Sequence, residues 1–331
     1  MSNEYTLKPS LVTQAMRLMI RAKRPLCLWG SPGTCKSQLV AQASAAEQLS
    51  LIDIRAVLLD PVDLRGLPHV NSDGRSHWAI PEFLPRDGCG VLFLDELNRA
   101  PQLVQNACFQ LILDRKLGEY NLPDGWTIVS ACNRESDGGG VTRMSSALAN
   151  RFTHMTVEPD LDDWCKWAVG ANVQPSVIAF LRFRSEYLHK FDRNERSYPT
   201  PRSWESVSFI CNQQPAAEIE LGLISGAVGY PAAIEFVAFL KLYRSLPSID
   251  AILLNPTTAA VPSDVATQFA VSAALARRAT DQNFGRVIQY LERLPIEYNV
   301  YTVRDATNRD SSLQSTAEFT NWSIKHSEVL N

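Results

Sequence analysis

The sequence lacks the features that mark several large classes of protein. No continuous apolar run approaches the roughly 20 residues that a membrane-spanning helix needs. The first 23 residues mix charges with a helical apolar period and lack the unbroken apolar core of a signal peptide. The seven cysteines are odd in number and have no C-x-x-C spacing, which argues against a disulfide framework or a zinc site. We therefore expect a soluble, cytoplasmic protein with reduced thiols and no insertion into a membrane.

An excess of charge of one sign is also missing. The 32 Lys and Arg residues nearly balance the 35 Asp and Glu residues, so nothing in the composition points to nucleic acid as a partner. The five histidines are scattered and no H-E-x-x-H pattern occurs, which leaves a metalloprotease without support. What is present is a chain of 331 residues, 45% of them apolar, long enough for two or three domains.

The two halves of the chain differ in pattern. In the first half, helical segments alternate with short β-rich runs, several of them continuously apolar, at 26–29, 51–59, 91–94, 127–132 and 153–157. Apolar runs of this kind are typical of strands covered by helices on both faces, and the alternation predicts a three-layer αβα fold with a mostly parallel, five-stranded sheet. On the helix at 100–116 we expect Leu103, Val104, Cys108 and Leu111 to share one side. After residue 158 the strand signals nearly vanish, and helical segments follow one another between proline-containing breaks.

The stretch GSPGTCKS, residues 30–37, has the pattern of a phosphate-binding loop between a strand and a helix. Backbone N–H groups at a helix N-terminus form a good anion site. The loop residues that we expect to surround the phosphates are Gly30, Ser31, Pro32, Gly33, Thr34 and Cys35, of which all but the proline carry an N–H group. Lys36 would reach the outer phosphates, and the Ser37 hydroxyl would ligate Mg²⁺.

Two further strands end in polar side chains that suit a nucleotide hydrolase. The apolar run at 91–94 leads into adjacent carboxylates, of which Asp95 would hold Mg²⁺ through water and Glu96 would orient or deprotonate the attacking water. The run at 127–132 ends before Asn133, which would lie beside the γ-phosphate if its strand is between the other two. ATP and Mg²⁺ are therefore the expected ligands.

With these motifs in hand, the chain resembles the AAA+ ATPases of the MoxR family over roughly residues 8–245. GSPGTCKS is similar to the Walker A motif, LFLDELNRAPQ to the Walker B region, LGEYNLPDGW to a hairpin before the sensor-one strand, SSALANRF to the arginine-finger segment and TPRSW to sensor two. The resemblance implies an AAA+ P-loop NTPase core at 1–158, an all-α lid at 159–245 and a helical C-terminal extension at 246–331.

The family pattern also implies roles for three arginines. Arg151 would project into the site of a neighbouring subunit as an arginine finger, with Arg143 in a glycine-flanked loop as its rival or companion. Arg202 would come from the lid to the γ-phosphate. Cys35 departs from the family pattern, because it stands where the family has glycine. We expect nucleotide binding to survive, since a small residue with helical φ can take this position. Redox sensitivity of the thiol is a further hypothesis.

The implied function is a homo-oligomeric, hexameric ring ATPase that remodels or assembles a partner protein, in a chaperone-like role with a von Willebrand factor A-type adaptor on another chain. Two alternatives stay open. A nucleic-acid motor would use the basic, aromatic stretch RFRSEYLHKFDRNERS at 182–197, against the balanced charge of the whole chain. A nucleotide switch with little hydrolysis would follow if Cys35 impairs the loop.

Overall fold

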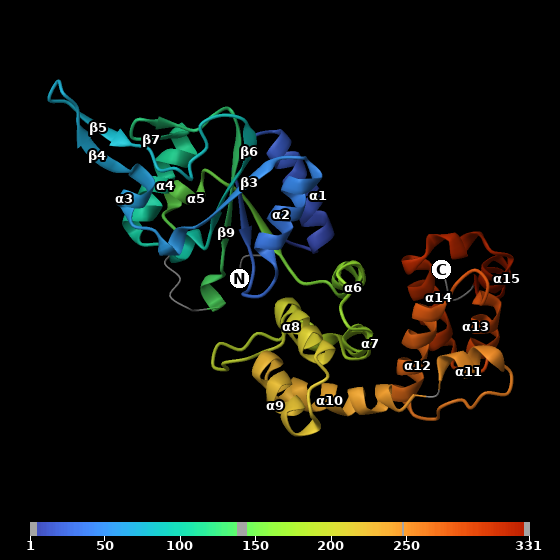
Figure 1. Cartoon of the computed structure of the whole chain (residues 1–331). Helices are drawn as coiled ribbons and strands as arrows, with labels where there is room; N and C mark the ends of the chain where they lie inside the picture. Colours follow the sequence, from blue (N-terminus) through green and yellow to red (C-terminus); the bar gives the residue numbers. More distant parts are fainter. Residues whose placement is uncertain (1–4, 138–143, 247, 328–331) are drawn as a thin grey trace. The chain divides into compact units, whose positions relative to one another are not determined.

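The computed structural model describes residues 5–137, 144–246 and 248–327 and groups the chain into two compact units (Figure 1). Unit 1 runs to Asp163 and includes two short later segments, 191–194 and 200–202. Unit 2 contains the remaining residues from Trp164 onward. The phosphate loop and the acidic pair both lie in unit 1.

Unit 1 is built on a six-stranded parallel sheet with strand order β1-β10-β2-β9-β6-β3. The five predicted strands are confirmed, although the run predicted at 51–59 ends as a strand at Arg55 and continues as a 3-10 helix. The sixth strand, β1, has two residues and leaves no periodic signal in the sequence. The strands are β1 (Thr6–Leu7), β2 (Leu26–Trp29), β3 (Ser50–Arg55), β6 (Cys89–Asp95), β9 (Gly125–Cys132) and β10 (Thr153–Val157).

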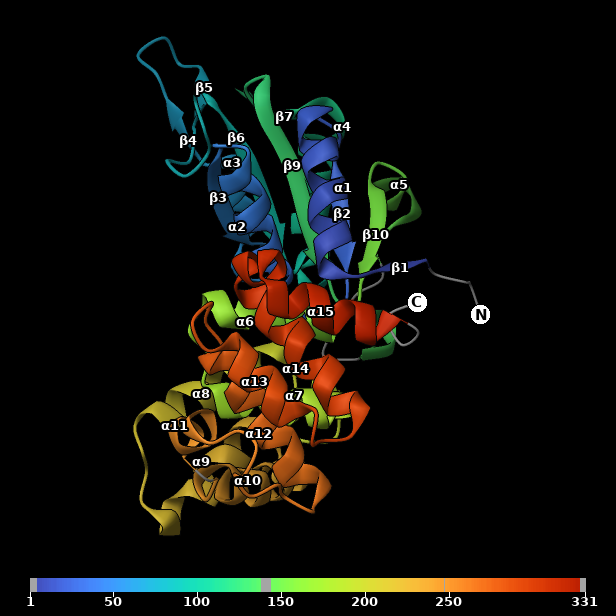
Figure 2. The ribbon, with the colours of Figure 1, turned by 90° about the vertical axis from the view of Figure 1, so that its right-hand side faces the viewer.

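Helices cover both faces of this sheet, as the continuous apolar strands predict (Figures 1 and 2). Alternate residues of each strand point to opposite faces, so Leu26 and Leu28 pack with α1 (Pro9–Arg21) and α2 (Lys36–Ala46). Leu92 and Leu94 pack on the other face, against α4 (Gln102–Asp114). The prediction that Leu103 shares one side of α4 with Val104, Cys108 and Leu111 is wrong. Leu103 is 67% exposed, whereas the other three residues are fully buried.

Two hairpins extend unit 1 beyond the sheet. The short helix α3 (Pro61–Arg65) leads into the hairpin of β4 (Leu67–Val70) and β5 (Ser76–Ala79), which projects away from the sheet in Figures 1 and 2. The hairpin expected before the sensor-one strand is formed by β7 (Lys116–Leu117) and β8 (Tyr120–Asn121). A short helix, α5 (Ser146–Ala149), precedes β10.

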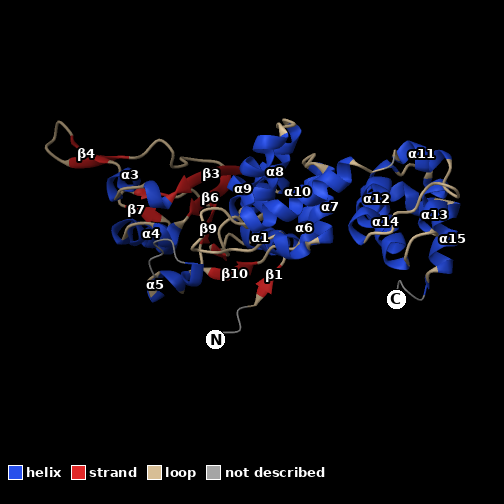
Figure 3. Cartoon of the chain, turned by 90° about the horizontal axis from the view of Figure 1, so that it is seen from below, coloured by secondary structure: helices blue, strands red, loops and turns tan. Residues whose placement is uncertain are grey.

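All described elements after β10 are helical, as predicted (Figure 3). They are α6 (Leu161–Gly170), α7 (Pro175–Phe183), α8 (Pro201–Asn212), α9 (Ala217–Val228), α10 (Tyr230–Arg244), α11 (Ile249–Leu254), α12 (Val265–Arg278), α13 (Phe284–Leu291), α14 (Ile296–Arg309) and α15 (Ala317–Lys325). Phe180, Trp204 and Phe236 pack in an aromatic core, with ring centroids 5.3–5.5 Å apart.

The helices on either side of residue 245 belong to the same unit. Helix α12 packs against α7 and α10. The predicted extension and most of the predicted lid lie within unit 2, so their division at residue 245 stays a prediction. In the described part of the chain, every helix is too short or too polar to cross a bilayer.

Candidate nucleotide site

Three adjacent strands bring the predicted site residues to one edge of the sheet. Strand β9 lies between β2 and β6, which is the arrangement that the prediction for Asn133 required. Trp29 at the end of β2 pairs with Cys132 at the end of β9, and Leu94 of β6 pairs with Ser130. Because the strands are parallel, the phosphate loop, the acidic pair and Asn133 all begin at the same edge.

The loop between β2 and α2 is closed by close contacts that admit only glycine at two positions. A β-carbon on Gly30 would lie 2.9 Å from the Val157 side chain. Gly33 has φ of +79°, in the region that favours glycine, and a β-carbon there would lie 2.7 Å from Thr200. The Thr34 hydroxyl donates a 2.9 Å hydrogen bond to the Ser31 carbonyl, which closes the turn.

Cys35 differs from the expectation of a helical φ. It is the N-cap residue of α2 and has φ of 59° and ψ of 29°, in the left-handed region. A β-carbon is unfavourable there, which explains physically why glycine is the ordinary choice at this position. The thiol donates a weak hydrogen bond of 3.7 Å to the Gly33 carbonyl. The loop therefore closes with cysteine, at the cost of backbone strain.

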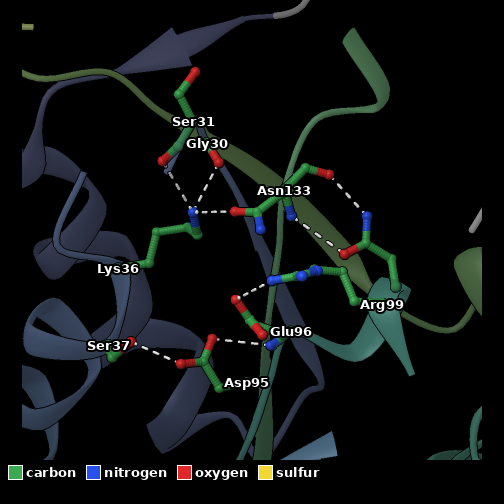
Figure 4. A network of polar contacts seen from close by, with 9 residues as sticks. Gly30, Ser31, Lys36, Ser37, Asp95, Glu96, Arg99 and Asn133 are labelled. Atoms are coloured by element: carbon green, nitrogen blue, oxygen red, sulfur yellow. Dashed lines mark hydrogen bonds and ion pairs between the residues drawn. The ribbon is translucent and has the colours of Figure 1, made fainter. Parts of the chain in front are cut away.

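Lys36 is a buried cation at the centre of the site (Figure 4). Its ammonium donates to the carbonyls of Gly30 at 2.7 Å and Ser31 at 3.2 Å and to Asn133 Oδ1 at 3.0 Å. Burial lowers its pKa to about 8, against the opposing pull of Asp95 and other groups. All three partners are neutral oxygens, so an anion entering the loop would stabilise the charged form of this lysine.

Ser37 and Asp95 are the pair that the sequence assigns to Mg²⁺. The Ser37 hydroxyl donates a 2.9 Å hydrogen bond to Asp95 Oδ2 (Figure 4). The two oxygens are close enough to hold the same ion, with the Ser37 hydroxyl as a ligand and Asp95 acting through water, as the sequence analysis expects. Mg²⁺ ordinarily takes few protein ligands and completes its coordination shell with phosphates and water.

Glu96 is held in an unusual conformation. Its φ is 55°, and its N–H donates to Asp95 Oδ1 at 2.9 Å. Its carboxylate forms an ion pair with Arg99, with 3.0 Å between Oε1 and Nη1 (Figure 4). The side chains of both residues are about one-third exposed. The expected base is thus at the site, with its carboxylate turned toward an arginine that the sequence analysis did not assign.

A second residue that the sequence analysis missed fixes the end of β9. The Asn98 amide donates to the Asn133 carbonyl at 2.7 Å and accepts from the Asn133 N–H at 3.2 Å. These bonds occupy the backbone of Asn133 and leave its side chain to contact Lys36. Asn98 and Arg99 follow the acidic pair within the stretch LDELNRA, so their position in that motif was the available signal.

The three predicted arginines have different positions. Arg202 belongs to unit 1, and its charge lowers the pKa of Lys36, which puts it within electrostatic reach of the loop. Arg151 is exposed and precedes β10, whose Thr153 pairs with Leu26 at the start of β2. Arg151 therefore lies toward the edge of the sheet opposite the phosphate loop. Arg143 lies outside the described residues.

Comparisons with known proteins agree with this geometry. Residues 25–152 match the AAA domain of the dynein-related subfamily. Midasin from Giardia intestinalis is 29% identical over 163 residues, which cover 45% of this chain and 3% of midasin. The uncharacterized protein YehL of Escherichia coli strain K12 is 28% identical over 179 residues, which cover 49% of this chain and 48% of YehL. The chain thus spans about half of YehL and a small part of midasin.

Among solved structures, NtrX from Brucella abortus in complex with ADP is 15% identical with a TM-score of 0.43, covering 93% of this chain and 68% of that one. The RuvB Holliday junction branch migration motor of Thermotoga maritima is 18% identical with a TM-score of 0.39, and the match covers 86% of this chain and 85% of that one. The family match and the loop geometry agree with each other: the three adjacent strands, the phosphate loop and the acidic pair described above lie within residues 25–152, the part of the chain that is similar to the AAA domain of the dynein-related subfamily.

Proposed function

We propose that this chain is an ATP hydrolase of the MoxR type that forms a homo-oligomeric, hexameric ring and remodels or assembles a partner protein in the cytoplasm. One observation carries the proposal: Lys36, Asp95 and Asn133 come together at one edge of the sheet. Lys36 begins α2 directly after the loop that follows β2, Asp95 ends β6, and Asn133 follows β9, which lies between these two strands. This arrangement can bind a nucleoside triphosphate at its phosphates and present its outer phosphate to water.

Each of these side chains has a distinct task in hydrolysis. Lys36, buried among neutral oxygens, would exchange one of them for a phosphate oxygen and regain a favourable charge pairing. Ser37 and Asp95 would hold Mg²⁺, which neutralises charge on the phosphates when bound. Glu96 would orient the attacking water and take its proton once its carboxylate leaves Arg99.

The position of Arg151 supports a site shared between subunits. The four residues of β2 span about 13 Å at 3.3 Å per residue, and Arg151 lies at the far end of this strand from the loop. An arginine at this edge is poorly placed for its own loop and well placed for a neighbour's. A closed ring gives every site such a neighbour.

Contact with the partner protein is assigned to the β4–β5 hairpin. Leu67 and Val70 are 66% and 71% exposed on this projecting element. Exposed apolar side chains on a protruding hairpin suit contact with another protein. We propose that this partner is a client or a von Willebrand factor A-type adaptor supplied by another chain.

ATP turnover per subunit, measured over a range of protein concentrations, tests the proposal. Turnover should rise with concentration and fall at least a hundredfold in Glu96→Gln and in Arg151→Ala. Arg24→Ala is a matched control, because Arg24 is exposed at the same edge of the sheet.

Mixing the two inactive variants separates a shared site from a structural defect. In a random mixture, about one interface in four combines an intact Glu96 with a neighbour's intact Arg151, so activity should return to about a quarter of normal. A mixture that stays inactive would refute the assignment of Arg151. A Glu96→Gln variant with undiminished turnover would refute the catalytic assignment.

A further inference from the structure

Residues 149–154 run from the end of α5 into β10 and carry Arg151; we call this segment the finger turn. Helix α5 lies beside the start of β10 (Figure 2). The Arg151 N–H donates to the Leu148 carbonyl at 3.1 Å, and the Phe152 N–H donates to the Ala149 carbonyl at 3.1 Å. Phe152 is buried in the core on the α4 face of the sheet, whereas Arg151 is exposed. The finger turn therefore presents Arg151 on a backbone that is hydrogen-bonded and anchored beside it.

One side chain closes the finger turn. His154 Nε2 lies 2.8 Å from the carbonyl oxygen of Ala149. His154 Nδ1 lies 2.8 Å from Nε1 of Trp29, the last residue of β2. An indole N–H can only donate, so Nδ1 accepts from Trp29, and Nε2 carries the proton that is donated to Ala149. Both nitrogens of this imidazole are thus engaged, each with a different element of unit 1.

The two hydrogen bonds of His154 connect the finger turn to β2. His154 is opposite Cys27 in the strand register, and Trp29 lies two residues further along β2, so the three side chains are on the same face of the sheet. The ring centres of His154 and Trp29 are 5.9 Å apart, and those of His154 and Phe152 are 6.3 Å apart. Strand β1 pairs with the last two residues of β10. The contacts of His154 therefore hold the other end of β10, where the finger turn enters the strand.

We propose that His154 is a positioning residue for Arg151 and holds it where it serves the nucleotide site of a neighbouring subunit. This inference rests on the proposed function, in which Arg151 acts on that neighbouring site. A charged group that is already in place stabilises a transition state better than one that must first be ordered. Trp29 directly precedes Gly30, the first residue of the phosphate loop. The arginine that a subunit offers to its neighbour is therefore held by the strand that ends at its own phosphate loop.

Two replacements of His154 separate its hydrogen bonds from the packing of its ring. His154→Phe keeps an aromatic ring beside Trp29 and Phe152 but has neither a donor nor an acceptor, so ATP turnover at saturating ATP should fall about tenfold. His154→Gln carries both a donor and an acceptor and should keep at least half of the normal turnover. Normal turnover in His154→Phe, or an equal loss in both variants, would overturn the proposal.

ADP affinity shows whether His154 serves its own phosphate loop instead. Because ADP binds to that loop and makes no use of the finger turn, its affinity in His154→Phe should stay within about twofold of normal. Thr153→Val is the matched control, because Thr153 is exposed on the same strand and its side chain points to the opposite face. The control should be normal in both assays. A tenfold weaker ADP affinity in His154→Phe would overturn the proposal.

Mixing subunits tests whether His154 acts on the neighbouring site. His154→Phe subunits keep an intact Glu96, and Glu96→Gln subunits keep an intact finger turn. In an equal random mixture about one interface in four combines the two intact parts, so turnover should reach about a quarter of normal. If His154 acted within its own subunit, half of the sites would work at a tenth of the normal rate, and the mixture would reach only about 5% of normal. That lower value would overturn the proposal.

The Arg151→Ala background separates failure of this inference from failure of the proposed function. Adding His154→Phe to Arg151→Ala should lower turnover no further, because the group that His154 positions is already absent. A further tenfold loss would overturn the proposal. If Glu96→Gln restores turnover when mixed with Arg151→Ala but not when mixed with His154→Phe, the role of His154 alone is refuted. If it restores neither, the action of Arg151 on a neighbouring site is refuted, and the role of His154 with it.

Discussion

Replacing Cys35 by glycine is expected to stabilise unit 1. The backbone of Cys35 has φ of 59° and ψ of 29°, and the left-handed region costs a residue with a β-carbon about 1–2 kcal/mol. Glycine avoids this cost but loses about 0.5–1 kcal/mol more conformational entropy on folding. The hydrogen bond from the thiol to the Gly33 carbonyl contributes little, because a thiol is a weak donor. The net gain in the free energy of unfolding is therefore about 0.5–1 kcal/mol.

Calorimetric unfolding without nucleotide measures this gain. For a cooperative unit of about 150–250 residues, 1 kcal/mol shifts the unfolding midpoint by about 2–4 °C, so Cys35→Gly should raise it by about 1–4 °C. Cys35→Ala is the matched control, because it removes the thiol and keeps the β-carbon. If both variants gain equally, or if the glycine variant gains nothing, the backbone of Cys35 is not strained and the reasoning is refuted.

Three other perturbations follow from the site. The pKa of Lys36 is about 8, so above pH 8 the free chain has a largely neutral Lys36, whereas a bound phosphate favours its charged form. ADP binding should therefore take up a proton, and its affinity should fall by up to tenfold per pH unit above pH 8. Calorimetry in buffers of different ionisation enthalpy measures the proton uptake, and an ADP affinity that is constant from pH 7 to 9.5 contradicts the prediction. Arg99→Ala should free the Glu96 carboxylate from its 3.0 Å ion pair and raise basal ATP turnover severalfold, whereas a fall in turnover would make Arg99 a positioning residue. A β-carbon at Gly33 would lie 2.7 Å from Thr200, whereas one at Gly74, which has nearly the same φ, would have no atom within 4 Å. Gly33→Ala should therefore lower the free energy of unfolding in urea more than Gly74→Ala does, and it should also weaken ADP binding. Equal losses in the two variants would contradict this.

The fold of unit 1 was readable from the sequence because its strands are continuous apolar runs that end in recognisable motifs. The runs ending at Trp29 and Cys132 needed no tertiary information to be identified as strands. The two-residue strand β1 was missed, because its pairing with β10 depends on where the chain returns. Leu103 was placed wrongly because the apolar stripe of α4 is narrower than its composition suggests.

The sequence predicted that Lys36, Ser37, Asp95 and Asn133 lie close together, which the contacts confirm, but it did not predict their local geometry. Residue type does not report φ, so the left-handed backbone at Cys35 and Glu96 appears in the structure alone. The partners of polar side chains depend on rotamers, and so the contacts of Arg99 with Glu96 and of Asn98 with Asn133 were missed. The roles of Arg151, Arg202 and Arg143 stay predictions.

The burial of the cysteines provides a natural reporter for the nucleotide site. Five of the seven thiols are buried, Cys89 is exposed, and Cys35 is partly exposed at the phosphate loop. A thiol reagent applied to the folded chain therefore meets two targets, and Cys89→Ser reduces them to one. In that variant, the rate at which the reagent labels Cys35 reports, in real time, the fraction of phosphate loops that a ligand protects.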